Sequence, residues 1–317
     1  MVMALFFACA GPEPVSPDTV EPSPPSFACP ELQWVQQLGS PGVERAWAVD
    51  IASDGDILVG GAFAGPVRFG VDAAGAEVSL EPACNSVLDD GFVARYAPDG
   101  SVRWAVSVGG CAWSRTEALV ATTDGGVVAA GWFGTAVEVG GVSYANPSPE
   151  YEGANQVWVA KWSAAGALEW FVPGYIDFLS SVSSVAVGPD GQVAVAGFFI
   201  STTGLTFPDG RNAPMVFPGA TQLESNYDAF LFALDRSGAV LWVTSFGNAR
   251  QDYPGQVAIA ADRVVVAHDL TTGDLVFDPS RPDGGRPGRV VPCRRHLARG
   301  ARRQYADIGF YARSGRF

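Results

Sequence analysis

Short apolar segments alternate with small and polar residues along most of the chain, and the same order of segments recurs. The first apolar segment of each repeat has a two-residue period, with apolar pairs at Val49/Ile51, Leu119/Ala121, Val185/Val187 and Val257/Ile259. This period predicts a β-strand with one face packed more heavily than the other. Because no long segment shows a 3.6-residue apolar period, the pattern predicts an all-β protein.

Each of these segments leads through a tight turn into a second strand. Asp-Gly at 54–55, 124–125 and 190–191 provides the residue types that adopt positive φ in a hairpin turn. The second strands read DILVGGAF, GVVAAGWF, QVAVAGFF and RVVVAHDL. They are nearly all apolar, which is expected of central strands covered on both faces.

Four tryptophans define the length of the repeat. They are Trp34, Trp104, Trp170 and Trp242, spaced 70, 66 and 72 residues apart. Third strands, which begin near Gly91, Val157 and Ala229, run through a Gly-containing turn into the Trp strands. Four antiparallel strands per repeat is the unit of a β-propeller, and the chain predicts about four such blades. We expect the four tryptophans to be core residues between blades.

The two ends of the repeat region are each incomplete. The first Trp strand, at 31–39, lacks its three partners, and the last repeat lacks a clear third strand. Gly-Phe-Tyr-Ala-Arg at 309–313 resembles Gly-Phe-Val-Ala-Arg at 91–95. We therefore predict that 308–313 pairs with 32–38 and closes a four-bladed ring without an open edge. The alternative is an incomplete part of a larger propeller.

The segment FVARYAPDGSVRWAVSVGG, followed by ALVATTDGGVVAAGWFGT, resembles the SBBP-type β-propeller repeat of secreted bacterial proteins. The resemblance covers about residues 32–280 and departs from the family pattern at His268-Asp269-Leu270. It implies a binding module at the cell surface or in the periplasm, and it supplies no catalytic residues.

The N-terminus predicts export. Residues 1–9 resemble the end of a bacterial lipoprotein signal, with Cys9 as the lipidated residue, although no basic residue precedes Arg45. The predicted division is a partial signal at 1–9, a Pro-rich linker at 10–30, propeller repeats at 31–280 and a basic tail at 281–317. Three interpretations of the basic tail remain open: it completes the last blade, it is a solvated loop, or it is a frameshift product. A nucleic-acid or membrane arm is the weaker interpretation.

Charge and cysteine content limit the partners. The formal net charge of −13 disfavours nucleic acid and anionic lipid over most of the surface. We therefore expect no nucleic-acid partner, and membrane contact only through a lipid anchor at Cys9. Cys84 and Cys111 both fall on the face predicted for the long loops, and export permits a disulfide between them. The cysteines lack zinc-binding spacing, and we expect neither a metal nor a cofactor.

Long loops after the second strands and shorter ones after the Trp strands are predicted to share one face. They hold aromatic residues suited to protein or glycan recognition, namely Trp113, Tyr151, Tyr175, Phe178, Tyr227 and Tyr253. The first hypothesis is a non-enzymatic cell-envelope binding module that uses this face. The alternative is a glycosidase or lyase that uses the loop carboxylates Asp89-Asp90 or Glu150 and Glu152. Packing of these aromatics against the blades is an equally simple interpretation.

Overall fold

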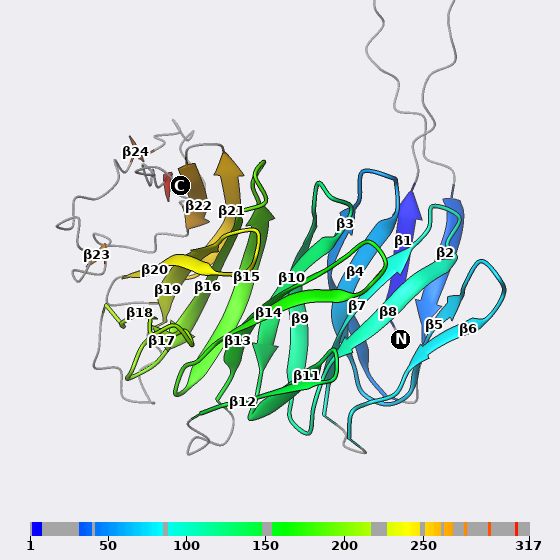
Figure 1. Cartoon of the computed structure of the whole chain (residues 1–317), viewed down its shortest axis with the longest axis horizontal. Helices are drawn as coiled ribbons and strands as arrows, with labels where there is room; N and C mark the ends of the chain where they lie inside the picture. Colours follow the sequence, from blue (N-terminus) through cyan, green and yellow to red (C-terminus); the bar gives the residue numbers. More distant parts are fainter. Residues whose placement is uncertain are drawn as a thin grey trace, which may run out of the picture.

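The structure is a computed structural model, and every regular element in its described part is a β-strand (Figure 1). The described residues are 2–7, 32–39, 42–84, 88–147, 154–216, 227–247, 251–260, 263–268, 276–277, 291–292 and 308–309. The all-β prediction is therefore confirmed.

Three repeats form complete four-stranded antiparallel sheets. Blade I consists of β3 (Glu44–Ile51), β4 (Ile57–Phe63), β7 (Asp90–Tyr96) and β8 (Val102–Val108). Blade II consists of β9 (Ser114–Ala121), β10 (Val127–Phe133), β13 (Gln156–Trp162) and β14 (Leu168–Gly174). Blade III consists of β15 (Leu179–Val187), β16 (Val193–Ile200), β19 (Asp228–Leu234) and β20 (Val240–Gly247). The predicted strand order within the repeat is thus confirmed.

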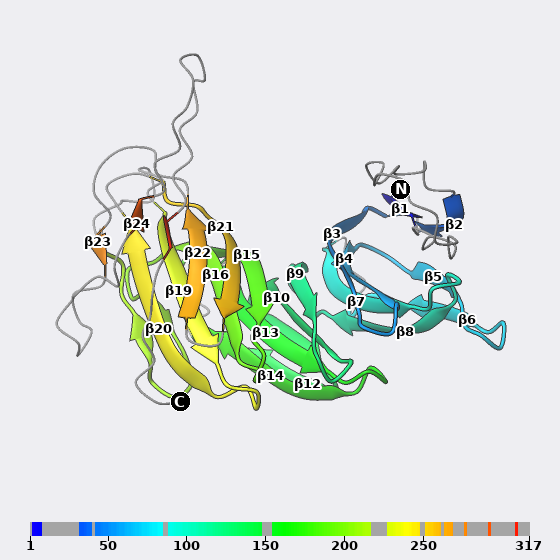
Figure 2. The same ribbon diagram turned by 90° about the horizontal axis from the view of Figure 1, so that it is seen from above.

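Successive blades pack face to face along an arc (Figure 2). The first strands, β3, β9 and β15, contact one another in sequence, while the Trp strands β8 and β14 lie at the outer side. Four-stranded sheets stacked in this way form a β-propeller. Its core lies between the blades, where apolar residues of neighbouring second and third strands bury one another.

The long insertions are not simple loops, because each contains a small hairpin. The hairpins are β5 (Val67–Val71) with β6 (Glu77–Leu80), β11 (Ala136–Val139) with β12 (Val142–Ala145), and β17 (Leu205–Thr206) with β18 (Asn212–Ala213). Each hairpin forms an antiparallel bridge to the end of the preceding Trp strand, and the three bridges are Gly39 to Arg68, Gly109 to Glu138 and Tyr175 to Thr206. The insertions therefore join neighbouring blades.

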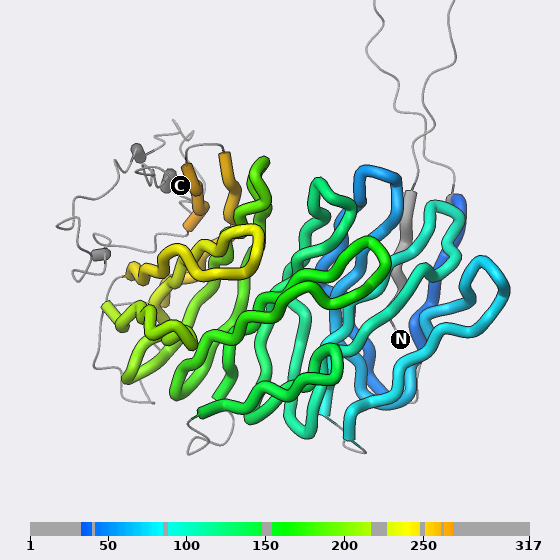
Figure 3. The backbone as a smooth tube through the Cα atoms, in the orientation of Figure 1, coloured from blue at the N-terminus to red at the C-terminus, as the bar shows by residue number. Residues whose placement is uncertain are grey.

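The two ends of the arc each hold part of a blade (Figure 3). At one end, β1 (Val2–Phe7) pairs with β2 (Leu32–Leu38); at the other, β21 (Pro254–Ala260) pairs with β22 (Arg263–His268). Three further short strands follow, namely β23 (Val276–Phe277), β24 (Val291–Pro292) and β25 (Ile308–Gly309). β23 extends the outer edge of blade III, and β24 pairs with β25.

The predicted pairing of 308–313 with the Trp34 strand is wrong. Ile308–Gly309 pairs with Val291–Pro292, and β2 pairs with β1 instead. Figures 1 and 2 both place β2 and β22 at opposite ends of the arc, so the five-residue similarity to blade I does not bring the ends together. Residues 310–313 lie outside the described part of the chain.

The recurrent tryptophans hold each blade to the next one. The indole N–H of Trp104 donates to the carbonyl of Ala164, 2.9 Å away in the turn between the third and fourth strands of blade II. Trp34 makes the same bond to Pro98 at 2.8 Å, and Trp170 makes it to Arg236 at 3.1 Å. All three rings are half-buried. The tryptophans therefore pack at blade junctions as expected, but on a turn and not inside the core.

A glycine in the second strand of blades I and II permits a β-bulge in the first strand beside it. A Cβ at Gly61 or Gly131 would lie 1.9 Å from the carbonyl oxygen of Arg45 or Arg115, respectively, which no side chain can satisfy. The pairing register shifts at these two points, at Ala46/Ala48 in β3 and at Ala130/Gly131 beside β9. A bulge redirects the neighbouring side chains, which here include those of the site described next.

Candidate functional site

The described parts of the predicted loops in blades I to III share one end of the blades, which we call the long-loop face. Cys84, in the insertion of blade I, forms a disulfide with Cys111, which follows the Trp strand, with Cα atoms 5.2 Å apart. This disulfide was predicted from the sequence and is confirmed. The amide of Ser114 also donates to the carbonyl of Asp89 at 2.9 Å. The insertion of blade I is therefore held against the segment that links β8 to β9.

Three tryptophans surround the guanidinium of Arg115 on this face. The Cζ atom of Arg115 lies 5.3 Å from the ring centroid of Trp47, 5.7 Å from that of Trp113 and 5.1 Å from that of Trp132. Each distance falls within the range of about 6 Å over which an aromatic ring attracts a cation. Trp47 comes from β3, Arg115 from β9 and Trp132 from β10, so the cluster joins blades I and II.

The register explains how distant residues meet here. Arg115 is the direct cross-strand partner of Trp132, and Trp47 is the bulged residue of β3. Trp113 immediately precedes β9, beside the disulfide at Cys111. We call these four residues, Trp47, Trp113, Arg115 and Trp132, the Trp–Arg cluster.

The Trp–Arg cluster is open to solvent on one side. Trp47 and Trp113 are each 42% exposed, whereas Trp132 is buried at 8% and forms the floor. Asp89 is buried and accepts from the Arg115 side chain at 3.1 Å and from Arg45 at 3.4 Å. Arg45 itself has about half of its side chain exposed. The cluster therefore presents two flat apolar rings beside cationic groups, a combination typical of binding hot spots.

The two aspartates proposed as catalytic are both engaged in structural bonds. Asp89 forms ion pairs with both Arg45 and Arg115, and the buried Asp90 accepts from the amides of Ala83 at 2.7 Å and Gly110 at 3.1 Å. Burial raises the pKa of Asp90, while these two backbone hydrogen bonds act in the opposite direction. The other proposed pair, Glu150 and Glu152, lies outside the described residues.

A further carboxylate, Glu117, joins blade II to blade III beside the cluster. It accepts from the Trp132 indole at 3.0 Å, from the Ser181 hydroxyl at 2.9 Å and from the Val182 amide at 2.7 Å. Burial is the largest influence and raises the pKa of Glu117, although the three hydrogen bonds favour its ionised form. Glu117 supports the floor of the cluster and was not singled out from the sequence.

Two predicted aromatics, Tyr227 and Tyr253, come together at a second junction. They form a group with Phe198 in which the ring centroids are 4.8 to 5.4 Å apart. Tyr253 is 39% exposed and its hydroxyl donates to Gln251 at 3.2 Å. This group lies between blade III and β21, on the same face as the Trp–Arg cluster.

The remaining predicted positions divide into two sets. Tyr175 is half-buried and pairs through its backbone with Thr206, and the carbonyl of the half-buried Phe178 accepts from the amide of Asn155. These two aromatics belong to the blade II–III junction. Tyr151 and Cys9 lie outside the described residues.

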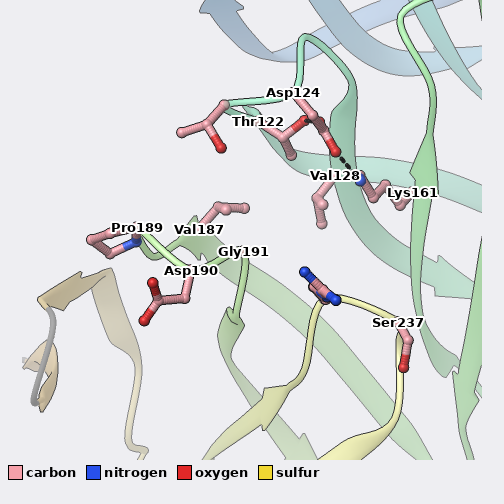
Figure 4. Close-up of a pocket in the computed structure, with 11 residues that line it drawn as sticks. Thr122, Asp124, Val128, Lys161, Val187, Pro189, Asp190, Gly191 and Ser237 are labelled. Atoms are coloured by element: carbon pink, nitrogen blue, oxygen red, sulfur yellow. Dashed lines mark hydrogen bonds and ion pairs between the residues drawn. The ribbon is translucent and has the colours of Figure 1, made fainter.

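The opposite face carries a cleft of about 540 Å³ between blades II and III (Figure 4). Figure 4 shows the Asp124–Lys161 ion pair on one side of it and the turn Pro189–Gly191 on the other. Lys161 also lies 2.9 Å from Glu169. The hydrogen bond from Lys161 is the largest cause that lowers the pKa of Asp124 to about 2. The cleft can admit a small polar molecule.

At the junction of blades I and II, an arginine fills the space that corresponds to this cleft. The buried Arg95 contacts Asp54 at 2.6 Å and Asp56 at 2.7 Å, and it donates at 2.5 Å to the carbonyl of Gly125 in the next blade. Lys161 occupies the same position of blade II and contacts two carboxylates of its own blade instead. The space between Lys161 and the turn Pro189–Gly191 of blade III is therefore left open, and this space is the cleft.

Two further findings concern metals and membranes. Within the described ranges, no group of three or more His, Cys, Asp or Glu side chains is placed to hold a metal ion. Over the same ranges, no helix has the length and apolarity to cross a bilayer.

Comparison with known proteins is consistent with this architecture. No family model matches the chain. An uncharacterized WD repeat-containing protein of Acanthamoeba polyphaga mimivirus is 23% identical over 286 residues, which cover 82% of this chain. WD repeats are four-stranded propeller blades. The chain is a β-propeller repeat protein. It spans 20% of the length of the mimivirus protein.

Among solved structures, a catalytically inactive virginiamycin B lyase from Staphylococcus aureus, crystallised with quinupristin, is 11% identical to this propeller. The match covers 81% of this chain and 92% of the lyase, with a TM-score of 0.23. A score this low supports no inference about fold or function.

Proposed function

We propose that this propeller is a non-enzymatic scaffold that binds a protein partner through the Trp–Arg cluster of its long-loop face. The observation that carries the proposal is the pair of half-exposed rings, Trp47 and Trp113, held around Arg115. Tryptophan and arginine are the residues most enriched among binding hot spots. The surrounding disulfide and ion pairs fix the rings before a partner arrives, which reduces the entropy lost on binding.

The similarity to a WD repeat-containing protein supports a scaffold role, since propeller faces are rigid platforms that present loops. The engagement of Asp89 and Asp90 in structural bonds argues against the described carboxylates as a glycosidase pair. A glycan ligand would use the same exposed rings, and the experiment below distinguishes a glycan ligand from a protein partner.

The test is alanine substitution at the exposed rings. Trp47→Ala and Trp113→Ala should each weaken capture of a partner protein at least tenfold, as hot-spot truncations of about 2 kcal/mol do. Val142→Ala is the matched control, because Val142 is an exposed apolar residue on a hairpin away from the cluster. If partner capture fell equally in all three variants, or in neither Trp variant, the proposed binding surface would be refuted. Binding to a glycan array that requires Trp47 would replace the protein partner with a sugar.

We also propose, from the sequence alone, that Cys9 anchors the chain to a cell-envelope membrane and that the repeats are of the SBBP type. Cleavage before Cys9 would remove residues 1–8, which include β1. Intact-mass measurement of protein from its native host tests this proposal. A mass that retains Met1 or Val2 and carries no lipid would refute it.

A further inference from the structure

The junction between blades I and II shows which chemical group fits between two blades on the face opposite the long loops. Arg95, on the third strand of blade I, donates to the carbonyl of Gly125, 2.5 Å away in the first turn of blade II. Its guanidinium also contacts Asp54 and Asp56 of its own blade, at 2.6 and 2.7 Å. A guanidinium therefore links carboxylates on one side of this junction to a turn carbonyl on the other.

The junction between blades II and III has the same backbone geometry but a shorter side chain. Lys161 has the register of Arg95, because each pairs with the recurrent tryptophan of the neighbouring strand. Gly191 corresponds to Gly125, since both have positive φ, 79° and 83°, and both donate at 3.0 Å to the carbonyl three residues earlier. Lys161 contacts two carboxylates of its own blade instead of crossing the junction. Within the described ranges, no donor reaches the Gly191 carbonyl.

Two charged side chains that line this cleft are also unpaired. Asp190 precedes Gly191, and Arg236 belongs to the second turn of the same blade; both are exposed. The two turns are adjacent, because a Cβ at Gly191 would lie 3.1 Å from the Cβ of Arg236. Among the described residues, neither side chain forms an ion pair or a hydrogen bond. The carboxylate of Asp235, next to Arg236 in sequence, is engaged within its own turn.

The charges of the lining disfavour a ligand of a single sign. Asp124 and Lys161 pair with each other, on the opposite side of the cleft from Asp190 (Figure 4). Asp190 and Arg236 are then the groups that a ligand must satisfy, and they have opposite signs. A simple anion would pair with Arg236 and face the unpaired Asp190. A simple amine would leave Arg236 unpaired and would share the cleft with the ammonium of Lys161.

We propose that the cleft binds a small molecule with a guanidinium at one end and a carboxylate at the other, as in the amino acid arginine. The guanidinium takes the place that the Arg95 side chain has one junction earlier, donating to the Gly191 carbonyl and pairing with Asp190. Guanidinium–carboxylate pairs are commonly bidentate and belong to the strong hydrogen bonds. The carboxylate of the ligand pairs with Arg236. The volume of about 540 Å³ lies within the range of small-molecule sites.

The test is isothermal titration calorimetry of the full chain with L-arginine and two analogues. L-Arginine should bind with a dissociation constant of about 1 mM or tighter. Citrulline, in which a neutral urea replaces the guanidinium, should bind at least about tenfold more weakly. Agmatine, which lacks the carboxylate, should also bind at least about tenfold more weakly, because Arg236 then stays unpaired.

Three variants locate the site. Lys161→Arg should weaken arginine binding at least about tenfold without removing a charge, because the longer side chain can reach the Gly191 carbonyl as Arg95 reaches Gly125. Asp190→Asn should have an effect of the same size. Glu81→Gln is the matched control, since it removes an exposed carboxylate in the insertion of blade I and should leave binding unchanged. Circular dichroism verifies that each variant is folded.

No binding of L-arginine at about 10 mM would overturn the proposal, as would citrulline binding as tightly as arginine. Agmatine binding as tightly as arginine would remove the role of Arg236 and overturn it too. Arginine binding that survives both Lys161→Arg and Asp190→Asn would place the site elsewhere. Because the cleft and the Trp–Arg cluster lie on opposite faces, Trp47→Ala should leave arginine binding unchanged, so this proposal and the proposed function can fail independently.

Discussion

Substitution of Trp104 by alanine should destabilise the protein by about 3–4 kcal/mol. The half-buried indole packs on the blade II turn, where a Cβ at Gly166 would lie 2.8 Å from its ring. A half-buried Trp side chain removes roughly 100 Å² of apolar surface from water, which at about 25 cal/mol per Å² contributes about 2.5 kcal/mol. Loss of the hydrogen bond to Ala164 adds about 0.5–1.5 kcal/mol.

The assay is urea denaturation followed by both circular dichroism and tryptophan fluorescence, because repeat proteins can unfold in more than one step. Trp104→Phe keeps most of the ring contact and should cost only about 1 kcal/mol, the value of the lost hydrogen bond. Trp170→Ala, which removes the same contact one blade later, should match Trp104→Ala within about 1 kcal/mol. A loss below about 1 kcal/mol for Trp104→Ala would contradict the assignment of these tryptophans to blade junctions.

Three further predictions follow from the described contacts. Cys111→Ser should lower the free energy of unfolding by about 2–4 kcal/mol by opening the 27-residue link to Cys84, and non-reducing peptide mapping should show the bond in the wild type. Arg95→Met should lower the free energy of unfolding by about 3 kcal/mol in urea denaturation, because it removes the buried and closer of the two arginines that contact the buried Asp56. Arg103→Met removes the half-exposed partner of Asp56 and should cost less than about 1 kcal/mol. The raised pKa of Glu117 means that its contribution to stability is fully present below about pH 4.5 and is lost as pH rises through the folded-state value. Above that pH, the melting temperature of Glu117→Gln should therefore vary less with pH than that of the wild type. Parallel plots of melting temperature against pH for the two proteins would refute a raised pKa at Glu117.

The local pattern of the sequence is sufficient to predict the blades. The two-residue period at Val185/Val187, the Asp-Gly turns and the recurrent tryptophans each act within a few residues, so strand order and turn position follow from them. The disulfide between Cys84 and Cys111 was also predictable, because strand order alone places both residues on one face.

Contacts between blades were not predictable in the same way. Trp47 and Arg115 come from different sheets, and they meet only because a bulge in β3 and a glycine at position 131 set the local backbone. The hairpins of the insertions were missed because their strands are only two to five residues long. The expected closure through 308–313 relied on five similar residues, too few to specify a strand partner.

The central claim is that the exposed rings of the Trp–Arg cluster are the surface that meets a protein partner. Site-specific photo-cross-linking in the native host tests it most directly, with a benzophenone amino acid placed in turn at positions 47, 113 and 142. We predict that the same partner polypeptide is cross-linked from Trp47 and Trp113 and not from Val142, as identified by mass spectrometry. Cross-linking to no protein from positions 47 and 113, or to the same proteins in equal yield from all three positions, would contradict the claim.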